Sequence, residues 1–224
     1  MSSLVPDETP QRLIDAAGPL FAARGRDGVG VREICQAAGA NVAAVNYHFG
    51  DKSRLYLATV REAARQCIEN VPLPAWPDGV PATERLADFI RTLLERVVVE
   101  HGPEWHKQLI MREVAMPSDA CIEFVRDFIR PQFQVLRGIV LDLLGDEAPE
   151  EQVRLTAFSI VGQCLFYRLA RPIVRNLSGE VAVRQLSADR LAAHIAGFSL
   201  AALGVHGATA RGGSMAADSG EGHS

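Results

Sequence analysis

A short stretch near the N-terminus concentrates side chains that bind nucleic acid. Asn46, Tyr47, His48 and Lys52 follow one another closely, and Arg32 precedes them. Amide and guanidinium groups form hydrogen bonds with base edges in the major groove. Hydroxyl, imidazole and ammonium groups donate hydrogen bonds to phosphate oxygens. These residue types therefore indicate contact with DNA.

Two short helices would position these side chains, and the sequence predicts both. A first helix over 31–38 has one apolar face at helical spacing. Its members are Val31, Ile34, Cys35 and Ala38. Gly39 suits the left-handed conformation that ends a helix and turns the chain sharply. Asn41 suits the N-cap of a second helix over 42–48, so the stretch predicts a helix-turn-helix.

The second helix is expected to present a small outward surface at its N-terminal end. Val45 is an inward position, which leaves Val42, Ala43 and Asn46 facing outward. This is the end that a recognition helix inserts into the major groove. Because Val42 and Ala43 carry no hydrogen-bonding side chain, base reading is expected to depend on Asn46, with Arg32 reaching in from the first helix.

A structural interpretation of this stretch is also possible, because two short helices joined at a glycine occur in many all-α proteins. The residues that follow favour DNA. Tyr47 and His48 are polar-tipped rings beside the outward surface. Lys52 lies in the first turn of the next predicted helix, where the macrodipole disfavours a cation and a phosphate would satisfy both the lysine and free backbone N–H groups. Taken alone, Lys52 is better explained as a solvated surface residue.

The rest of the chain also has a helical pattern, without the alternation of strands or the turn pairs of hairpins. An all-α fold is therefore predicted. Helices are expected over 9–24, 31–38, 42–48, 52–70, 82–100, 103–115, 118–144, 149–175 and 187–205. Pro131 predicts a kink or a break within 118–144, because proline lacks a backbone donor and clashes with the preceding turn.

A proline-rich segment divides the chain into two parts. Residues 71–81 contain four prolines and cannot continue a helix. We therefore expect a three-helix DNA-binding domain with its helix-turn-helix within 9–70, and a larger helical domain over 71–205. Residues 1–8 are expected to be flexible. Residues 206–224, rich in Gly, Ala and Ser, are expected to be disordered.

The charge distribution limits how the protein can hold DNA. The formal net charge is −4. Residues 1–66 carry eight Arg and Lys against seven Asp and Glu, whereas residues 67–224 carry fifteen against twenty. Affinity must then come from a few well-placed phosphate contacts rather than from a broad positive field.

Other classes of protein receive little support from the sequence. No apolar run is long enough to span a membrane and the start lacks signal-peptide features, which predicts a cytoplasmic protein without a membrane partner. Four widely separated cysteines predict neither a disulfide nor a metal site, and no cofactor motif is found. Because the common nucleophile, phosphate-loop and metalloprotease motifs are also missing, we expect no enzyme. A helical ligand-binding or adaptor protein with a degenerate DNA-binding domain is the alternative.

Residues 9–66 resemble the DNA-binding domain of the TetR family of bacterial transcriptional regulators. The resemblance is carried by Leu13–Ala17 with Phe21–Gly25, by Val31–Gly39 and by Val45–Leu55. It implies that Arg32, Val42, Ala43 and Asn46 face bases, while Tyr47, His48 and Lys52 hold the backbone. The expected DNA-binding set is Arg32, Asn41, Val42, Ala43, Asn46, Tyr47, His48 and Lys52. Gly30 departs from the Ser or Thr common in the family, and glycine also caps a helix adequately.

The resemblance further implies a homodimeric repressor that binds a palindromic DNA operator and is released by a small-molecule effector. The sequence itself shows that the helix over 149–175 has too many apolar residues for one buried stripe. With the helix over 187–205, it is expected to form a four-helix interface with a second copy. An ordinary monomeric core is the alternative.

Two later segments are similar to the C-terminal domain of CecR-like regulators. They are Leu109–Ser118 and Gly162–Pro172. Because ligand pockets are mostly apolar with a few placed polar groups, the candidate effector-binding residues are Trp105, His106, Arg112, Glu113, Gln163 and Tyr167. Arg112 and Glu113 could instead meet partners on neighbouring helices, and Trp105 and Tyr167 could be core residues.

Overall fold

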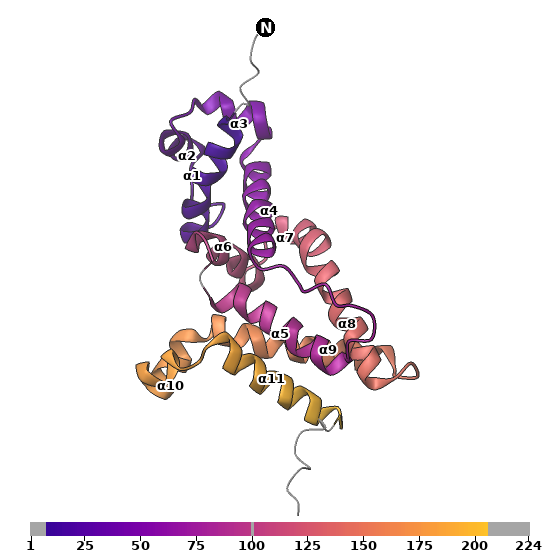
Figure 1. Ribbon diagram of the computed structural model, residues 1–224. Helices are drawn as coiled ribbons and strands as arrows, with labels where there is room; N and C mark the ends of the chain where they lie inside the picture. The colour runs from indigo at the N-terminus through magenta and orange to yellow at the C-terminus, as the bar shows by residue number, and fades with distance from the viewer. Residues whose placement is uncertain (1–7, 100, 206–224) are drawn as a thin grey trace, which may run out of the picture.

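The part of the chain that the structure describes is built from helices (Figure 1). The computed structural model describes residues 8–99 and 101–205. The expectations for the two ends of the chain concern residues 1–7 and 206–224, which lie outside these ranges. The first helices form the upper end of the molecule in Figure 1, and α10 and α11 form the lower end.

The N-terminal helices have the bounds that their caps and glycines predict. They are α1 (Thr9–Arg24), α2 (Val31–Ala38), α3 (Val42–Phe49) and α4 (Lys52–Asn70). These bounds confirm the predicted helices over 9–24, 31–38 and 52–70, and α3 is one residue longer than predicted. Gly39 adopts the expected left-handed conformation after α2, with φ 60° and ψ 37°, which costs glycine little because it has no Cβ.

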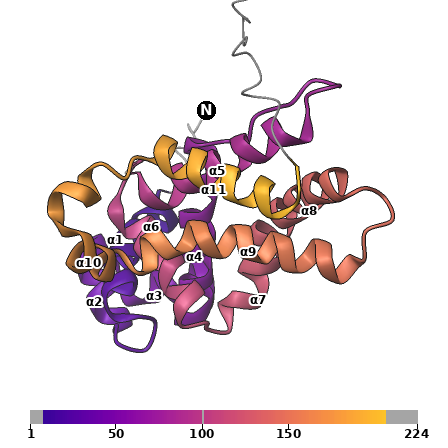
Figure 2. The same ribbon diagram turned by 90° about the horizontal axis from the view of Figure 1, so that it is seen from below.

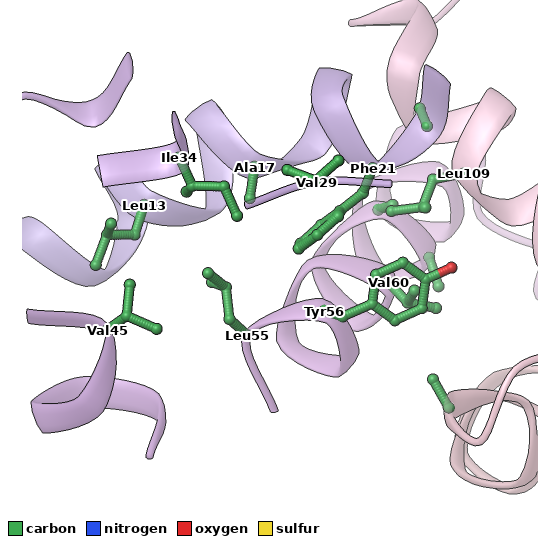
Figure 3. Packing of buried hydrophobic residues seen from close by; sticks show 14 of the residues in the cluster. Leu13, Ala17, Phe21, Val29, Ile34, Val45, Leu55, Tyr56, Val60 and Leu109 are labelled. Atoms are coloured by element: carbon green, nitrogen blue, oxygen red, sulfur yellow. The ribbon is translucent and has the colours of Figure 1, made fainter. Parts of the chain in front are cut away.

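A first apolar core joins the N-terminal helices to a later one. The rings of Phe21 on α1 and Tyr56 on α4 pack edge to face, with centroids 5.0 Å apart. Val45 of α3 is fully buried in the same cluster. Figure 3 shows Leu109 beside Phe21, although Leu109 lies beyond the proline-rich segment on α6 (Glu104–Ala115). Helix α6 therefore packs against α1 and α4.

A second apolar core lies among the later helices. Leu86, Ile90, Leu136, Ile160 and Ile195 are buried in it. Its buried residues come from α5 (Ala82–Val98), α8 (Arg130–Leu144), α9 (Glu150–Leu169) and α11 (Ala188–Ala202). The short α7 (Ala120–Phe124) contributes to the first core instead, and α10 (Arg171–Arg184) follows α9. Helix α9 runs across this part with α11 beside it (Figure 2).

The irregularity predicted at Pro131 takes the form of a π-helical turn. Helix η1 (Val125–Ile129) connects α7 to α8 without a gap, and the Arg130 N–H donates to the Val125 carbonyl. Pro131 then lies in the first turn of α8. A wider helical turn before Pro131 leaves space for the proline ring, and it does not require the backbone N–H that proline lacks.

The prediction of one continuous helix over 149–175 is wrong. Helix α9 ends at Leu169, Ala170 leaves the helical conformation, and α10 begins at Arg171. Pro172 explains the new start, because proline is tolerated in the first turn of a helix but not inside one. Within α10, Gly179 has φ 81° and ψ 161° and produces a kink.

Candidate nucleic-acid interface and ligand cavity

The turn between α2 and α3 is fixed by hydrogen bonds at both helix ends. Ala40 N–H donates to the Cys35 carbonyl at 2.9 Å. The Asn41 Oδ1 accepts from the Ala43 N–H at 2.9 Å, which confirms the predicted N-cap. Because Val45 is fully buried, α3 is held with one face in the core and the opposite face outward.

The outward surface contains the residues expected there. Arg32, Ala43 and Asn46 are exposed, and the ring of Tyr47 is 84% exposed. His48 is half-buried and meets Tyr47 edge to face, with ring centroids 4.8 Å apart. Helix α3 lies at the upper end of the molecule, away from α10 and α11 (Figure 1). The arrangement leaves α3 accessible to a large partner such as a duplex.

Lys52 has a structural partner that the sequence did not indicate. Its Nζ donates to the Val29 carbonyl at 3.1 Å and so holds the loop before α2. The preceding Asp51 caps α4, since its Oδ1 accepts from the Arg54 N–H at 2.8 Å. One N–H of this helix end is thus satisfied from within the chain, where a phosphate was expected. The ammonium group of Lys52 retains further N–H donors, and its contact with phosphate stays a prediction.

Several helices line a partly open apolar cavity of about 400 Å3. Five phenylalanines contribute to its wall, namely Phe89, Phe124, Phe128, Phe133 and Phe158. Its charged and amide-bearing residues are Arg96, Lys107, Glu113 and Gln132. The volume and the mainly apolar lining are typical of small-molecule sites. The π-helical turn contributes Val125, Phe128 and Ile129, and such turns are frequent at functional sites.

A second apolar region lies on the outer surface of α9, α10 and α11. It consists of Leu155, Phe166, Leu169, Ile173, Leu177, Val181 and Phe198, all exposed, and is called here the open face. An open groove of about 580 Å3 lies between α9 and α11 within it. Large exposed apolar surfaces usually mark protein contacts.

Both the N-terminal and the C-terminal part of the chain match models of known protein families. The model of the C-terminal domain of HTH-type transcriptional dual regulator CecR matches residues 82–203, and that of bacterial regulatory proteins of the tetR family matches residues 13–59. The chain belongs to the TetR family. Its C-terminal part is a CecR-type domain, and the protein is a DNA-binding transcriptional regulator rather than a member of an enzyme family.

Individual relatives of this TetR-family regulator agree with the assignment. It is 25% identical over 186 residues to the dual regulator CecR of Shigella flexneri, covering 79% of this chain and 82% of that protein. It is 38% identical over 66 residues to the transcriptional repressor AcnR of Corynebacterium efficiens, covering 30% of this chain and 35% of that protein.

Solved structures share the fold of this TetR-family chain. A tetR-family regulatory protein from Rhodococcus RHA1 has a TM-score of 0.64 at 18% identity, covering 88% of this chain and 98% of that one. AibR in complex with isovaleryl coenzyme A and operator DNA has a TM-score of 0.60 at 18% identity, covering 85% and 97%. Among the described residues no helix is long and apolar enough to cross a membrane.

The structure brings only one of the six candidate effector residues to the cavity. Glu113 lies in the cavity wall, whereas Gln163 lines the groove of the open face and Tyr167 lines a smaller pocket beside α10. Trp105 packs against Gly18 of α1, and Arg112 lies beside Gly25.

His106 is buried on α6, next to Trp105. The helical pattern showed that these six side chains were polar or aromatic, but not which face of each helix meets the cavity. Arg96, Lys107 and Gln132, which line it, were missed because their spacing differs in no way from that of surface residues.

Glu113 connects the cavity wall to the DNA-binding helices. Its carboxylate accepts from the Tyr56 hydroxyl at 2.5 Å, the Ser118 N–H at 3.2 Å and the Ser118 hydroxyl at 3.0 Å. Burial and the neighbouring Glu113 raise the pKa of Tyr56 above its ordinary value, so the tyrosine stays a donor. This buried contact joins α4 directly to α6.

A second connection joins α4 to the π-helical turn. The Arg61 guanidinium binds the carboxylates of Glu123 and Asp127, at 2.8 and 2.7 Å. Hydrogen bonds from Arg126 and Arg61 lower the pKa of Asp127 to about 2. Helix α4 is therefore linked to two parts of the cavity wall, α6 and η1.

Proposed function

We propose that this TetR-family regulator is a homodimeric repressor that binds a palindromic operator and leaves it when a small molecule occupies the cavity. One observation carries the proposal: α4 belongs to both sites. Its first residue, Lys52, holds the loop before α2. Its last turns contribute Ala64, Cys67 and Ile68 to the cavity wall. A ligand that displaces the last turns of α4 therefore also displaces the end that supports the DNA surface.

The DNA contacts divide into two groups with different consequences. Asn46 and Arg32 would form hydrogen bonds with base edges, while Val42 and Ala43 pack against thymine methyl groups. Tyr47, His48 and Lys52 would contact phosphates, which positions the protein without reading sequence. Asn41, at the N-cap of α3, sets the angle at which the helix enters the groove. The protein would thus bind DNA generally and recognise few bases directly.

The open face supplies the dimer contact in this proposal. Its exposed apolar residues lie on α9, α10 and α11, at the lower end of the molecule and opposite α3 (Figure 1). Burying such side chains against a second copy removes apolar surface from water, which stabilises association. A two-fold dimer would place two copies of α3 about 34–36 Å apart, one turn of DNA, on a palindromic operator.

Release follows if the ligand favours a dimer whose α3 helices no longer match that spacing. A ligand can shift the equilibrium only by its difference in affinity for the two forms, and a tenfold loss of operator affinity corresponds to about 1.4 kcal/mol of coupling. Similarity to the repressor AcnR supports repression rather than activation of transcription. AibR, solved with isovaleryl coenzyme A and operator DNA, shows that a protein of similar fold can bind both a small molecule and DNA, which supports the proposal.

Selection of bound duplexes from a random pool tests the DNA and dimer parts together. Wild-type protein is expected to enrich an inverted repeat whose half-sites lie about one helical turn apart. The Asn46→Ala variant, processed in parallel, is expected to enrich a less defined sequence. Enrichment of no sequence by the wild type, or of a single half-site, would contradict the proposal.

A further inference from the structure

The cavity wall includes a half-buried cation, Arg96, that has no acidic partner among the described residues. Arg96 on α5 donates from Nε to the Val71 carbonyl at 2.7 Å and from Nη1 to the Gln132 Oε1 at 3.0 Å. Its Nη2 is buried and has no hydrogen-bond partner among the described residues. Both partners of Arg96 are neutral oxygens, so the guanidinium charge is solvated but not compensated. Burial lowers the pKa of Arg96, yet arginine remains protonated in proteins.

Among the described residues, the one carboxylate in the cavity wall already has hydrogen-bond partners. Glu113 accepts three hydrogen bonds, from Tyr56 and Ser118, and it does not meet Arg96. Lys107, also in the wall, is buried and contributes a second positive charge. Burial raises the pKa of Cys67, while the charges of Lys107 and Arg96 act to lower it. The two cations thus lie near the same thiol, and Lys107 also lies near the carboxylate of Glu104, whose pKa it acts to lower.

The rest of the wall is apolar and aromatic. Phe133 and Phe158 stack with their centroids 5.0 Å apart, and Phe89, Phe124 and Phe128 complete the set. Such a wall favours a hydrocarbon or aryl group. Nη2 of Arg96 is buried, where an unpaired polar group is costly, and an anionic group that binds the guanidinium would lower that cost.

We propose that the cavity binds an organic acid with an apolar body, whose carboxylate is held by Arg96 and whose body packs against the phenylalanines. The proposal deepens the proposed function by naming the chemical class of its effector. Binding to the cavity can nevertheless be measured without DNA. The carboxylate accepts from Nη2 in a charge-assisted hydrogen bond.

Calorimetry with three probes that share one alkyl chain tests this assignment. Decanoate, decanol and decylamine are titrated into the full-length protein below their aggregation concentrations. Decanoate is expected to bind about tenfold more tightly than decanol, since hydrogen bonds between charged groups are the strong ones, and decylamine is expected to bind most weakly. Equal affinities for decanoate and decanol in the wild type would overturn the proposal without any variant.

Two substitutions on α5 then assign the preference to Arg96. Arg96→Gln is expected to reduce the decanoate preference to within about twofold of decanol, while Arg96→Lys retains part of it because the charge remains. Arg91→Gln is the matched control, because Arg91 pairs with Asp189 at the surface, at 3.1 Å. An undiminished preference in a folded Arg96→Gln protein would overturn the role of Arg96. Decanoate binding that leaves operator affinity unchanged would instead contradict the proposed function and leave the ligand class intact.

Discussion

Helix α9 borders two apolar regions that differ in enclosure and in charge. On one side Phe158, Val161 and Leu165 line the cavity. On another side Leu155 and Phe166 belong to the open face. The cavity includes the half-buried Arg96, whose guanidinium has no acidic partner among the described residues. The groove of the open face is lined by neutral residues and the exposed acid Glu151.

This difference separates a site for a small molecule from a site for a protein. A partly enclosed space whose wall includes an incompletely bonded cation favours ligands with a matching polar group. A broad surface of exposed apolar side chains offers area but no buried charge, which suits a second protein surface. The same helix can therefore report ligand binding on one face while it contributes to dimerisation on another.

Substitution on the open face is expected to have the largest effect. Phe166→Glu places a charge where the proposed dimer is dry and is expected to weaken dimerisation by roughly 3 kcal/mol or more, a loss of over about 100-fold in affinity. Sedimentation across a concentration series measures this. Ile122→Glu is the control, since Ile122 is 77% exposed on α7 and lies outside the open face. A Phe166→Glu protein that stays dimeric would remove the open face from the proposal.

Substitution on α3 leaves both apolar regions intact and isolates base reading. Asn46→Ala is expected to lose about 1–3 kcal/mol of discrimination between operator and random duplex, because a side-chain hydrogen bond to a base edge disappears. Fluorescence anisotropy with both duplexes gives the two affinities. Equal weakening on both duplexes would exclude a base contact by Asn46, and the same criterion applies to Arg32→Ala.

Lys52→Ala is expected to behave differently, because Lys52 is proposed to contact a phosphate and binds a backbone carbonyl in the structure. It should weaken all duplexes to a similar degree and flatten the dependence of affinity on salt. Since Lys52 also holds the Val29 carbonyl, stability is measured in parallel. If a folded variant shows an unchanged dependence of affinity on salt, Lys52 does not contact phosphate and only stabilises the loop before α2.

Tyr56→Phe tests the connection from the cavity wall to α4. It removes one of three donors to buried Glu113 and is expected to lower the free energy of unfolding by about 1–3 kcal/mol. Urea denaturation measures the change. Tyr47→Phe is the matched control, since Tyr47 is mostly exposed and its change is expected within about 0.5 kcal/mol. Equal stability of the two variants would show that the Tyr56–Glu113 contact contributes little.

The smallest effect is expected at the half-buried contact between Arg61 and Asp127 of the π-helical turn. The pKa of Asp127, at about 2, lies below its usual value near 3.9. The stabilisation from this carboxylate is therefore complete above about pH 4 and lost as the pH falls toward 2. In Arg61→Gln the pKa is expected to rise only part of the way, because Arg126 remains bound. If an NMR titration shows the same pKa for Asp127 in Arg61→Gln as in the wild type, Arg61 does not contribute to lowering that pKa.

The sequence predicted the parts of the structure that depend on local signals. Gly39, Asn41 and the apolar spacing of the first helices fix α1 to α4 within a residue, since caps and faces are properties of neighbouring residues. The sequence did not predict that the irregularity near Pro131 would be a π-helical turn, and it did not predict the break at Ala170. Proline marks such places but does not determine how the chain adapts.

The cavity was not predictable in the same way. Arg96, Gln132 and Lys107 line one cavity only because α5, α6 and α8 come together around it. Periodicity within one helix does not reveal which helices pack together. The sequence selected Glu113 as a candidate because it is a polar residue on a predicted helix. It did not indicate the contact with Tyr56, because the two residues lie on opposite sides of the proline-rich segment in the chain.

Release of operator by a ligand in the cavity tests the central claim most directly. Wild-type protein bound to the selected operator is titrated with decanoate and compared with Leu165→Trp, whose larger side chain fills part of the cavity from α9. Fluorescence anisotropy is expected to show release of the wild type and retention of the variant. Equal release of both proteins, or no release of the wild type although calorimetry shows ligand bound, would contradict control of DNA binding by the cavity.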